Sequence, residues 1–195
     1  MMLRENGAVN HRDEEKLALS LLGSETHCVH MTGESIDRIF RNGQLVEERR
    51  GHNLVVNTFL NLVMCLIKKQ SGYTGIQYWA VGSGSPSWDG NIPTPDLNAN
   101  KLTAELGRVA IPASEITFLD SNYDETNTPT NIIQVKHTFG TADCNGVWRE
   151  FGLFGGNATA NANSGIMVNK RHHAVLTKTS DMTVERTMRF TLNLT

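Results

Sequence analysis

The side chains best suited to metal binding lie in two short stretches. The stretch HCVH, at residues 27–30, offers the thiol and imidazole groups that zinc prefers. No second pair of cysteine or histidine residues stands at the spacing of a zinc site, because the other cysteines stand alone. Asp120, Asp124 and Glu125 offer oxygen ligands, but their spacing does not match a calcium-binding loop. We therefore predict no metal site and interpret the acidic stretch as a solvated loop.

Two glycine-containing stretches have the outline of phosphate-binding or catalytic loops. AVGSGSPS, at residues 80–87, lacks a third glycine and a following helix, whose N-terminus a phosphate site needs. GLFGG, at residues 152–156, has no central serine for a nucleophile elbow and no following lysine for a P-loop. Cys144 has no base close to it in the sequence. We predict no catalytic residue and no cofactor, and we expect these glycines to allow unusual φ angles or close backbone approach.

Length and charge narrow the class of protein further. The chain has 195 residues and a net charge of −2, whereas a dedicated nucleic-acid binder carries a basic excess. The longest apolar run, near residues 59–67, is too short to span a bilayer. Three widely separated cysteines indicate a reduced, intracellular chain, and the charged N-terminus is unlike a signal peptide. We therefore expect neither nucleic acid nor a membrane among the partners.

The N-terminal residues 1–25 differ from the rest of the chain. They are polar at first, and DEEKLALSLLGSE then favours a short helix, with Asp13 as its N-cap and Gly23 as its stop. We predict an N-terminal arm that is either mobile or ordered only on a partner.

A hairpin and one helix follow the arm. Asn42–Gly43 is typical of a hairpin turn, and it predicts strands near residues 36–41 and 44–49. Apolar residues at helical spacing predict one α-helix near residues 54–69. Its apolar face is wide, so we expect most of it to be covered, by a sheet.

From Ile76 onward the pattern changes to short strands separated by turn residues. His137 falls on an apolar strand face, which favours a hydrogen-bonded core histidine, whereas RHH at 171–173 is typical of an exposed strand end. In the last strand Arg186 interrupts an apolar face made by Met182, Val184, Met188, Phe190, Leu192 and Leu194. We predict a mainly β fold, a jelly-roll-like antiparallel β-sandwich with one packed helix, forming a single domain over residues 26–195.

Charged and aromatic residues are mixed in the predicted strand at 147–154. Strict alternation places Val147, Arg149, Phe151 and Leu153 on one side and Trp148, Glu150, Gly152 and Phe154 on the other. Neither side is a clean solvent face, and arginine and tryptophan are enriched where proteins bind proteins. The candidate interface residues are Trp148, Arg149, Glu150, Phe151, Phe154 and Arg186. A buried pair within the chain, such as Glu150 with Arg186, explains the pattern equally well.

The order of these pieces resembles that of structural proteins of tailed bacteriophages and prophages. The matching segments are NGQLVEE at 42–48, HNLVV at 52–56, YWAVGSG at 78–84, LTAELGR at 102–108, WREFGLFGGNAT at 148–159, SGIMVN at 164–169 and ERTMRFT at 185–191. The resemblance covers roughly residues 36–194, and its most specific motif is WREFGLFGG. It implies a non-enzymatic virion component of the tail, baseplate, collar or fibre-adaptor region, without catalytic residues.

We therefore expect a virion protein that assembles in the host bacterial cytoplasm. Its expected partners are other copies of itself, in a ring or trimer, and other virion structural proteins. A capsid decoration or cement protein is an alternative with the same features, distinguished by its copy number. A host-surface module that binds or cleaves glycans is a further alternative, with Trp88 as the candidate glycan contact. Trp88 is equally explained as a residue that pins a long loop.

Overall fold

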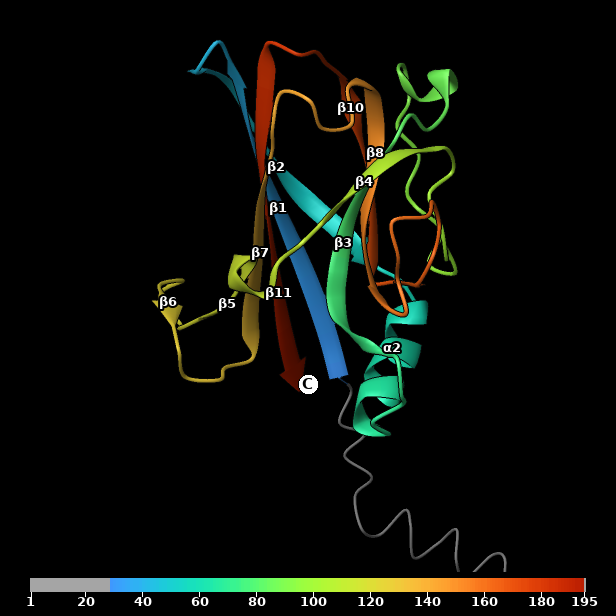
Figure 1. The fold of residues 1–195 in the computed structure, drawn as a ribbon, viewed down its shortest axis with the longest axis vertical. Helices are drawn as coiled ribbons and strands as arrows, with labels where there is room; N and C mark the ends of the chain where they lie inside the picture. The colour runs from blue at the N-terminus through green and yellow to red at the C-terminus, as the bar shows by residue number, and fades with distance from the viewer. Residues whose placement is uncertain (1–28, 195) are drawn as a thin grey trace, which may run out of the picture. The chain divides into compact units, whose positions relative to one another are not determined.

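A computed structural model describes residues 29–194 and shows a mainly β fold with antiparallel strands (Figure 1). The sandwich-like class predicted from the sequence is confirmed. The predicted arm at 1–25 lies outside the described residues. Residues 31–193 form one compact unit. The described elements, in chain order, are β1 (Val29–Arg41), β2 (Gln44–Val55), α2 (Thr58–Ile67), β3 (Thr74–Gly82), β4 (Glu105–Ala110), β5 (Ile116–Leu119), β6 (Glu125–Thr126), β7 (Ile132–Phe139), β8 (Gly146–Gly156), β9 (Ile166–Met167), β10 (Asn169–Lys178) and β11 (Met182–Leu194).

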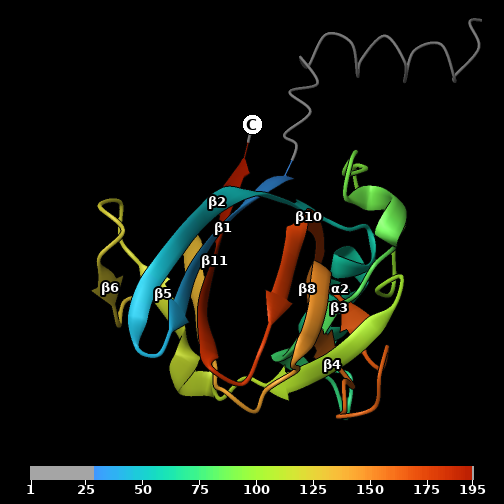
Figure 2. The same cartoon turned by 90° about the horizontal axis from the view of Figure 1, so that it is seen from above.

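The strands follow the order β4-β3-β8-β10-β2-β1-β11-β7-β5-β6, and β9 pairs with β8. Two layers face each other (Figure 2), and we call them the β8 layer (β4, β3, β8, β10, β9) and the β1 layer (β2, β1, β11, β7, β5, β6). The strand β2 joins them. Most of it pairs with β1, but Leu54 and Val55 pair with Lys170 and Asn169 of β10.

The hairpin predicted at Asn42–Gly43 is confirmed. Both residues have positive φ, 48° and 77°, which suits a tight turn between β1 and β2. Both strands are longer than predicted. Because β2 extends to Val55, helix α2 begins only at Thr58, later than the predicted boundary near residue 54. The helix ends at Ile67, and Lys69 turns the chain with a φ of 55°.

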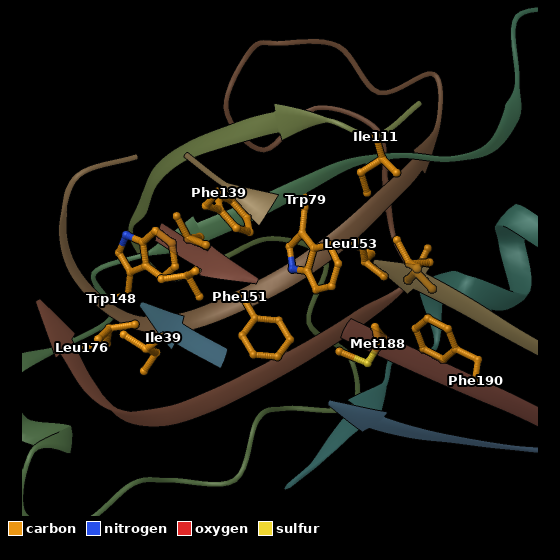
Figure 3. Close-up of a cluster of buried hydrophobic side chains, with 14 of the residues drawn as sticks. Ile39, Trp79, Ile111, Phe139, Trp148, Phe151, Leu153, Leu176, Met188 and Phe190 are labelled. Atoms are coloured by element: carbon orange, nitrogen blue, oxygen red, sulfur yellow. The ribbon is translucent and has the colours of Figure 1, made fainter. Parts of the chain in front are cut away.

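The core lies between the two layers and is rich in aromatic rings (Figure 3). Trp79 and Phe151 from the β8 layer and Phe139 from the β1 layer are fully buried. The Trp79 ring meets each of the two phenylalanine rings edge-on, with centroids 6.2 Å apart. Burial of such large apolar groups is the main favourable term in folding. In β11 the alternation predicted from sequence is confirmed for Met182, Val184, Met188 and Phe190, which are all buried.

Candidate functional site

The strand β8 departs from strict alternation at its centre. Trp148 and Phe151 both lie in the core cluster, although alternation predicts opposite faces for them. The pairing of β8 with β10 is irregular here, between His172 and Leu176, which accounts for the shift. As a result the side chains of Arg149 and Glu150, which lie between Trp148 and Phe151 in the sequence, contact the loop between β3 and β4 outside the β8 layer.

Inside the core, Arg186 is paired with Asp37 of β1. Its Nε and Nη2 donate hydrogen bonds of 2.6 and 2.7 Å to the two carboxylate oxygens. The guanidinium carbon lies 3.9 Å from the Phe151 ring centroid, so the charge also rests on an aromatic face. Burial alone would raise the pKa of Asp37, but the charge and hydrogen bonds of Arg186 outweigh it and hold that pKa below its ordinary value. The predicted Glu150–Arg186 pair is therefore wrong.

Two residues of β10 extend this buried polar cluster. His173 is buried, and this burial, with the nearby Arg186 charge as a second cause, lowers its pKa to about 3. Arg171 donates a hydrogen bond to Ser35 Oγ, and burial lowers its pKa as well. The prediction that residues 171–173 form an exposed strand end is wrong, because β10 lies between β8 and β2 in the sheet order.

On the outer side of the β8 layer, Glu150 is fully buried by the loop between β3 and β4. The Ala104 N–H donates a 2.8 Å hydrogen bond to Glu150 Oε1. Lys170 Nζ lies 3.1 Å from Oε2 and also donates to the Lys101 carbonyl oxygen and to Thr103 Oγ1. This buried ion pair ties the end of the loop, residues 101–104, to β8 and β10.

The beginning of the same loop is held by Trp88 and Asp89. The Trp88 ring stacks on His172, with centroids 4.1 Å apart, and Arg149 forms two hydrogen bonds of 2.6 and 2.8 Å with Asp89. Gly84 has a φ of 55°, and a Cβ there would lie 2.3 Å from the Trp88 ring. His172 Nε2 lies 3.8 Å from Glu150 Oε2, and burial lowers the His172 pKa. The geometry favours Trp88 as a residue that pins the loop.

A second surface loop, residues 157–165, is fixed from β4. The buried pair Arg108–Glu105 is 2.6 Å long, and Arg108 Nη1 donates to the carbonyl oxygens of Thr159 and Ser164. The guanidinium carbon of Arg108 lies 4.6 Å from the Phe154 ring centroid. Three segments that are far apart in sequence, LTAELGR, GLFGG and SGIMVN, therefore meet at one structural cluster.

The structure places most of the candidate interface residues inside the chain. Five of the six candidate side chains are buried within the chain, and they are Trp148, Glu150, Phe151, Phe154 and Arg186. A fully buried side chain is not available to a second subunit without unfolding. The sixth, Arg149, is partly buried and engaged with Asp89. The alternative of pairing within the chain fits these residues, with partners other than those predicted.

The other sequence candidates lie apart from one another. Asp120 Oδ1 accepts hydrogen bonds from the N–H groups of Asn122 and Asp124, so it organises its own loop. His137 is a hydrogen-bonded histidine, as predicted, with its Nδ1 2.6 Å from Glu115 Oε2. The first half of HCVH, residues 27 and 28, lies outside the described residues. Within residues 29–194, no group of three His, Cys, Asp or Glu residues could hold a metal ion.

Sequence reasoning missed an apolar surface on α2. The helix was expected to be largely covered, but Leu62 is its only buried residue. Leu60, Met64 and Ile67 are 61, 62 and 69% exposed. Beside them, a groove of about 620 Å³ opens between α2, β3, β5 and β7. The wide apolar face of the helix in the sequence was the signal for this surface, because the sheet covers only part of that face. Figure 1 shows this helix beside the end of β3, on the side of the β8 layer.

Comparisons with known proteins reveal no relative of this chain. Within the part of the chain that the structure describes, no helix has the length and apolar character needed to cross a membrane. No family model, curated protein or solved structure matches the chain.

Proposed function

We propose that this chain is a non-enzymatic structural component of a tailed-phage virion. It belongs to the tail, baseplate, collar or fibre-adaptor region and assembles through symmetric contacts with other copies, as a ring or trimer, and with other virion proteins. The resemblance of residues 36–194 to phage structural proteins supports the proposal. The observation that carries it is the apolar surface on α2, because single proteins rarely leave several large apolar side chains exposed together.

The polar clusters of the β8 layer agree with a structural role. Glu150 and Lys170 tie down the loop between β3 and β4, and Arg108 ties down residues 157–165. Each of these side chains holds backbone or an opposite charge of the same chain. The motif WREFGLFGG is thus used to build a rigid layer with fixed loops, which suits a protein that must present a constant shape to its neighbours.

Location in the particle tests this proposal. A gold-labelled antibody against the chain should mark the tail, baseplate or collar in negative-stain images of intact phage particles. Label spread evenly over the capsid would favour a decoration or cement protein. Particles that carry no label, from lysates in which the chain is present, would contradict the proposal.

A further inference from the structure

The exposed side of α2 has the form of a docking surface. Leu60, Met64 and Ile67 are spaced by four and three residues, so they share one face of the helix. Leu66, on the adjoining side, is 42% exposed and also lines the groove. The exposed helix face and the apolar groove therefore lie on two sides of the same helix, with the partly buried Val63 between them. We call the helix face and the groove together the α2 surface.

The groove itself is apolar and open. It has a volume of about 620 Å³, and the side chains that line it include Phe59, Leu66, Ile76, Ile111, Ile116 and Ile133. Apart from Ile111, which follows β4, these residues come from α2 and from strands of both layers, so the floor is part of the sandwich. A preformed apolar groove of this kind binds an amphipathic helix through regularly spaced side chains.

One end of the α2 surface is positively charged. Lys68 and Lys69 follow the last residue of α2 directly, and both are exposed. Lys68 Nζ donates to the Gln70 side chain, and no carboxylate among the described residues pairs with either lysine. A helical segment that has an apolar face and acidic residues at one end would complement this surface in both shape and charge.

The chain itself contains a sequence of this description. In DEEKLALSLL, at residues 13–22, the positions of Leu17, Ala18, Leu21 and Leu22 fall on one face at helical spacing. Three acids, Asp13, Glu14 and Glu15, precede them and are followed by one base, Lys16, so the segment carries a net charge of −2. The segment thus pairs an apolar stripe with an acidic end, and the α2 surface pairs an apolar groove with a basic end.

We propose that residues 13–22 of one copy dock as a helix on the α2 surface of a second copy, with the acidic end at Lys68 and Lys69. This inference rests on the self-assembly in the proposed function and names its contact. Residues 23–28 connect the segment to β1, and six extended residues span up to about 20 Å. The connection is longer than helix α2, whose ten residues measure about 15 Å, so the segment is not confined to the copy that carries it. Repeated head-to-tail, such contacts close a ring.

Two full-length variants separate the two halves of the contact. L17D/L21D disables the docking segment and leaves the α2 surface intact, whereas M64D/I67D disables the surface and leaves the segment intact. Met64 and Ile67 are exposed, so their replacement should leave the fold unchanged. The matched control is V46D, because Val46 is 56% exposed in the β1–β2 hairpin, away from α2.

The variants are compared by mass photometry and light scattering, alone and mixed. We expect wild type and V46D to associate. Each double variant alone should associate at least about tenfold more weakly, because a charge replaces a leucine-sized group that is buried in the contact. A 1:1 mixture of the two double variants should form a heterodimer, since each supplies the half that the other lacks. A mixture that stays monomeric, or double variants that associate like wild type, would overturn the inference.

A charge exchange tests the proposed orientation. E14K and K68E should each weaken association, and the chain carrying both should recover it at low salt.

Failure of the mixing experiment is distinguishable from failure of the proposed function. If the two double variants form no heterodimer but the protein is found in the tail, only this contact is refuted. If they form the heterodimer but the protein is absent from particles, only the virion role is refuted.

Discussion

Asp37 and Arg186 place a full ion pair in the core, where each side chain is at most 3% exposed. Taking two charges out of water costs several kcal/mol per ion, and the pair recovers this only through its close geometry. Arg186 is compensated by two hydrogen bonds to Asp37 and by contacts with the Phe151 and Trp148 rings. The pair also joins β1 to β11 within the β1 layer.

Removing one partner of this pair should be far more harmful than removing both. Arg186→Met leaves the Asp37 carboxylate buried alone, and we expect the free energy of unfolding to fall by about 3–5 kcal/mol. The double variant Asp37→Leu/Arg186→Met should recover most of that loss. Urea denaturation at pH 7 measures both. A single variant as stable as wild type would show that the pair is not desolvated as described.

The same cluster makes stability depend on pH. The pKa of His173 is lowered to about 3, so the folded state keeps this side chain neutral while the unfolded state takes up a proton below about pH 6.5. Stability is therefore lost as the pH falls through this window, by about 1.4 kcal/mol per pH unit from this group. The lowered pKa of Asp37 acts in the same direction at still lower pH.

Denaturation of His173→Phe checks this pH dependence. The phenyl ring is neutral at every pH and would lie beside Phe151, whose ring centroid is 5.7 Å from that of His173. We expect the slope of unfolding free energy between pH 6 and pH 4 to become shallower than in wild type. A slope equal to that of wild type would mean that His173 is protonated in the folded protein.

Among the elements, the loop between β3 and β4 is held at both ends by side chains of the β8 layer. Trp88→Ala removes the stacking on His172 but leaves the Arg149–Asp89 and Glu150–Lys170 pairs. We expect faster hydrogen exchange of amides in residues 85–100, with a loss of global stability of about 0.5–1.5 kcal/mol. Unchanged exchange together with lost phage adsorption would instead support glycan binding by Trp88.

The packing of α2 on the sheet depends on Gly155 in β8. A Cβ there would lie 2.5 Å from the Gly75 carbonyl oxygen and 2.9 Å from Leu62, the buried residue of α2. Gly155→Ala should lower the free energy of unfolding by about 1–3 kcal/mol, because the backbone must move. Gly90→Ala is the matched control, since a Cβ at Gly90 meets nothing within 4 Å. Equal stability of the two variants would contradict this close approach.

The sequence predicted the elements better than their contacts. Period-two patterns and the Asn42–Gly43 turn depend on local chemistry, so β11 and the β1–β2 hairpin were predictable. The partner of Arg186 was not, because Asp37 is 149 residues away in sequence and the pairing depends on the strand order. The faces of Trp148 and Phe151 were missed because an irregular pairing with β10 has no signature in β8 itself. The exposure of α2 depends on how much of the helix the sheet reaches.

At the scale of the whole molecule, residues 31–193 present a sandwich with fixed loops on one layer and an apolar helix at one end. A large apolar surface in water favours association, and a rigid body with one such surface assembles with defined geometry. The proposed docking of residues 13–22 on a neighbouring copy adds a head-to-tail contact that repeats around the ring. The proposed function is therefore that of a subunit which acts by assembling.

The copy number in purified phage particles tests this account most directly. Quantitative mass spectrometry against the major capsid protein should find between about six and a few dozen copies of the chain per particle, as ring symmetry in a tail requires. Hundreds of copies would assign it to the capsid shell instead. No detectable copies in intact, infectious particles would contradict a structural role in the virion.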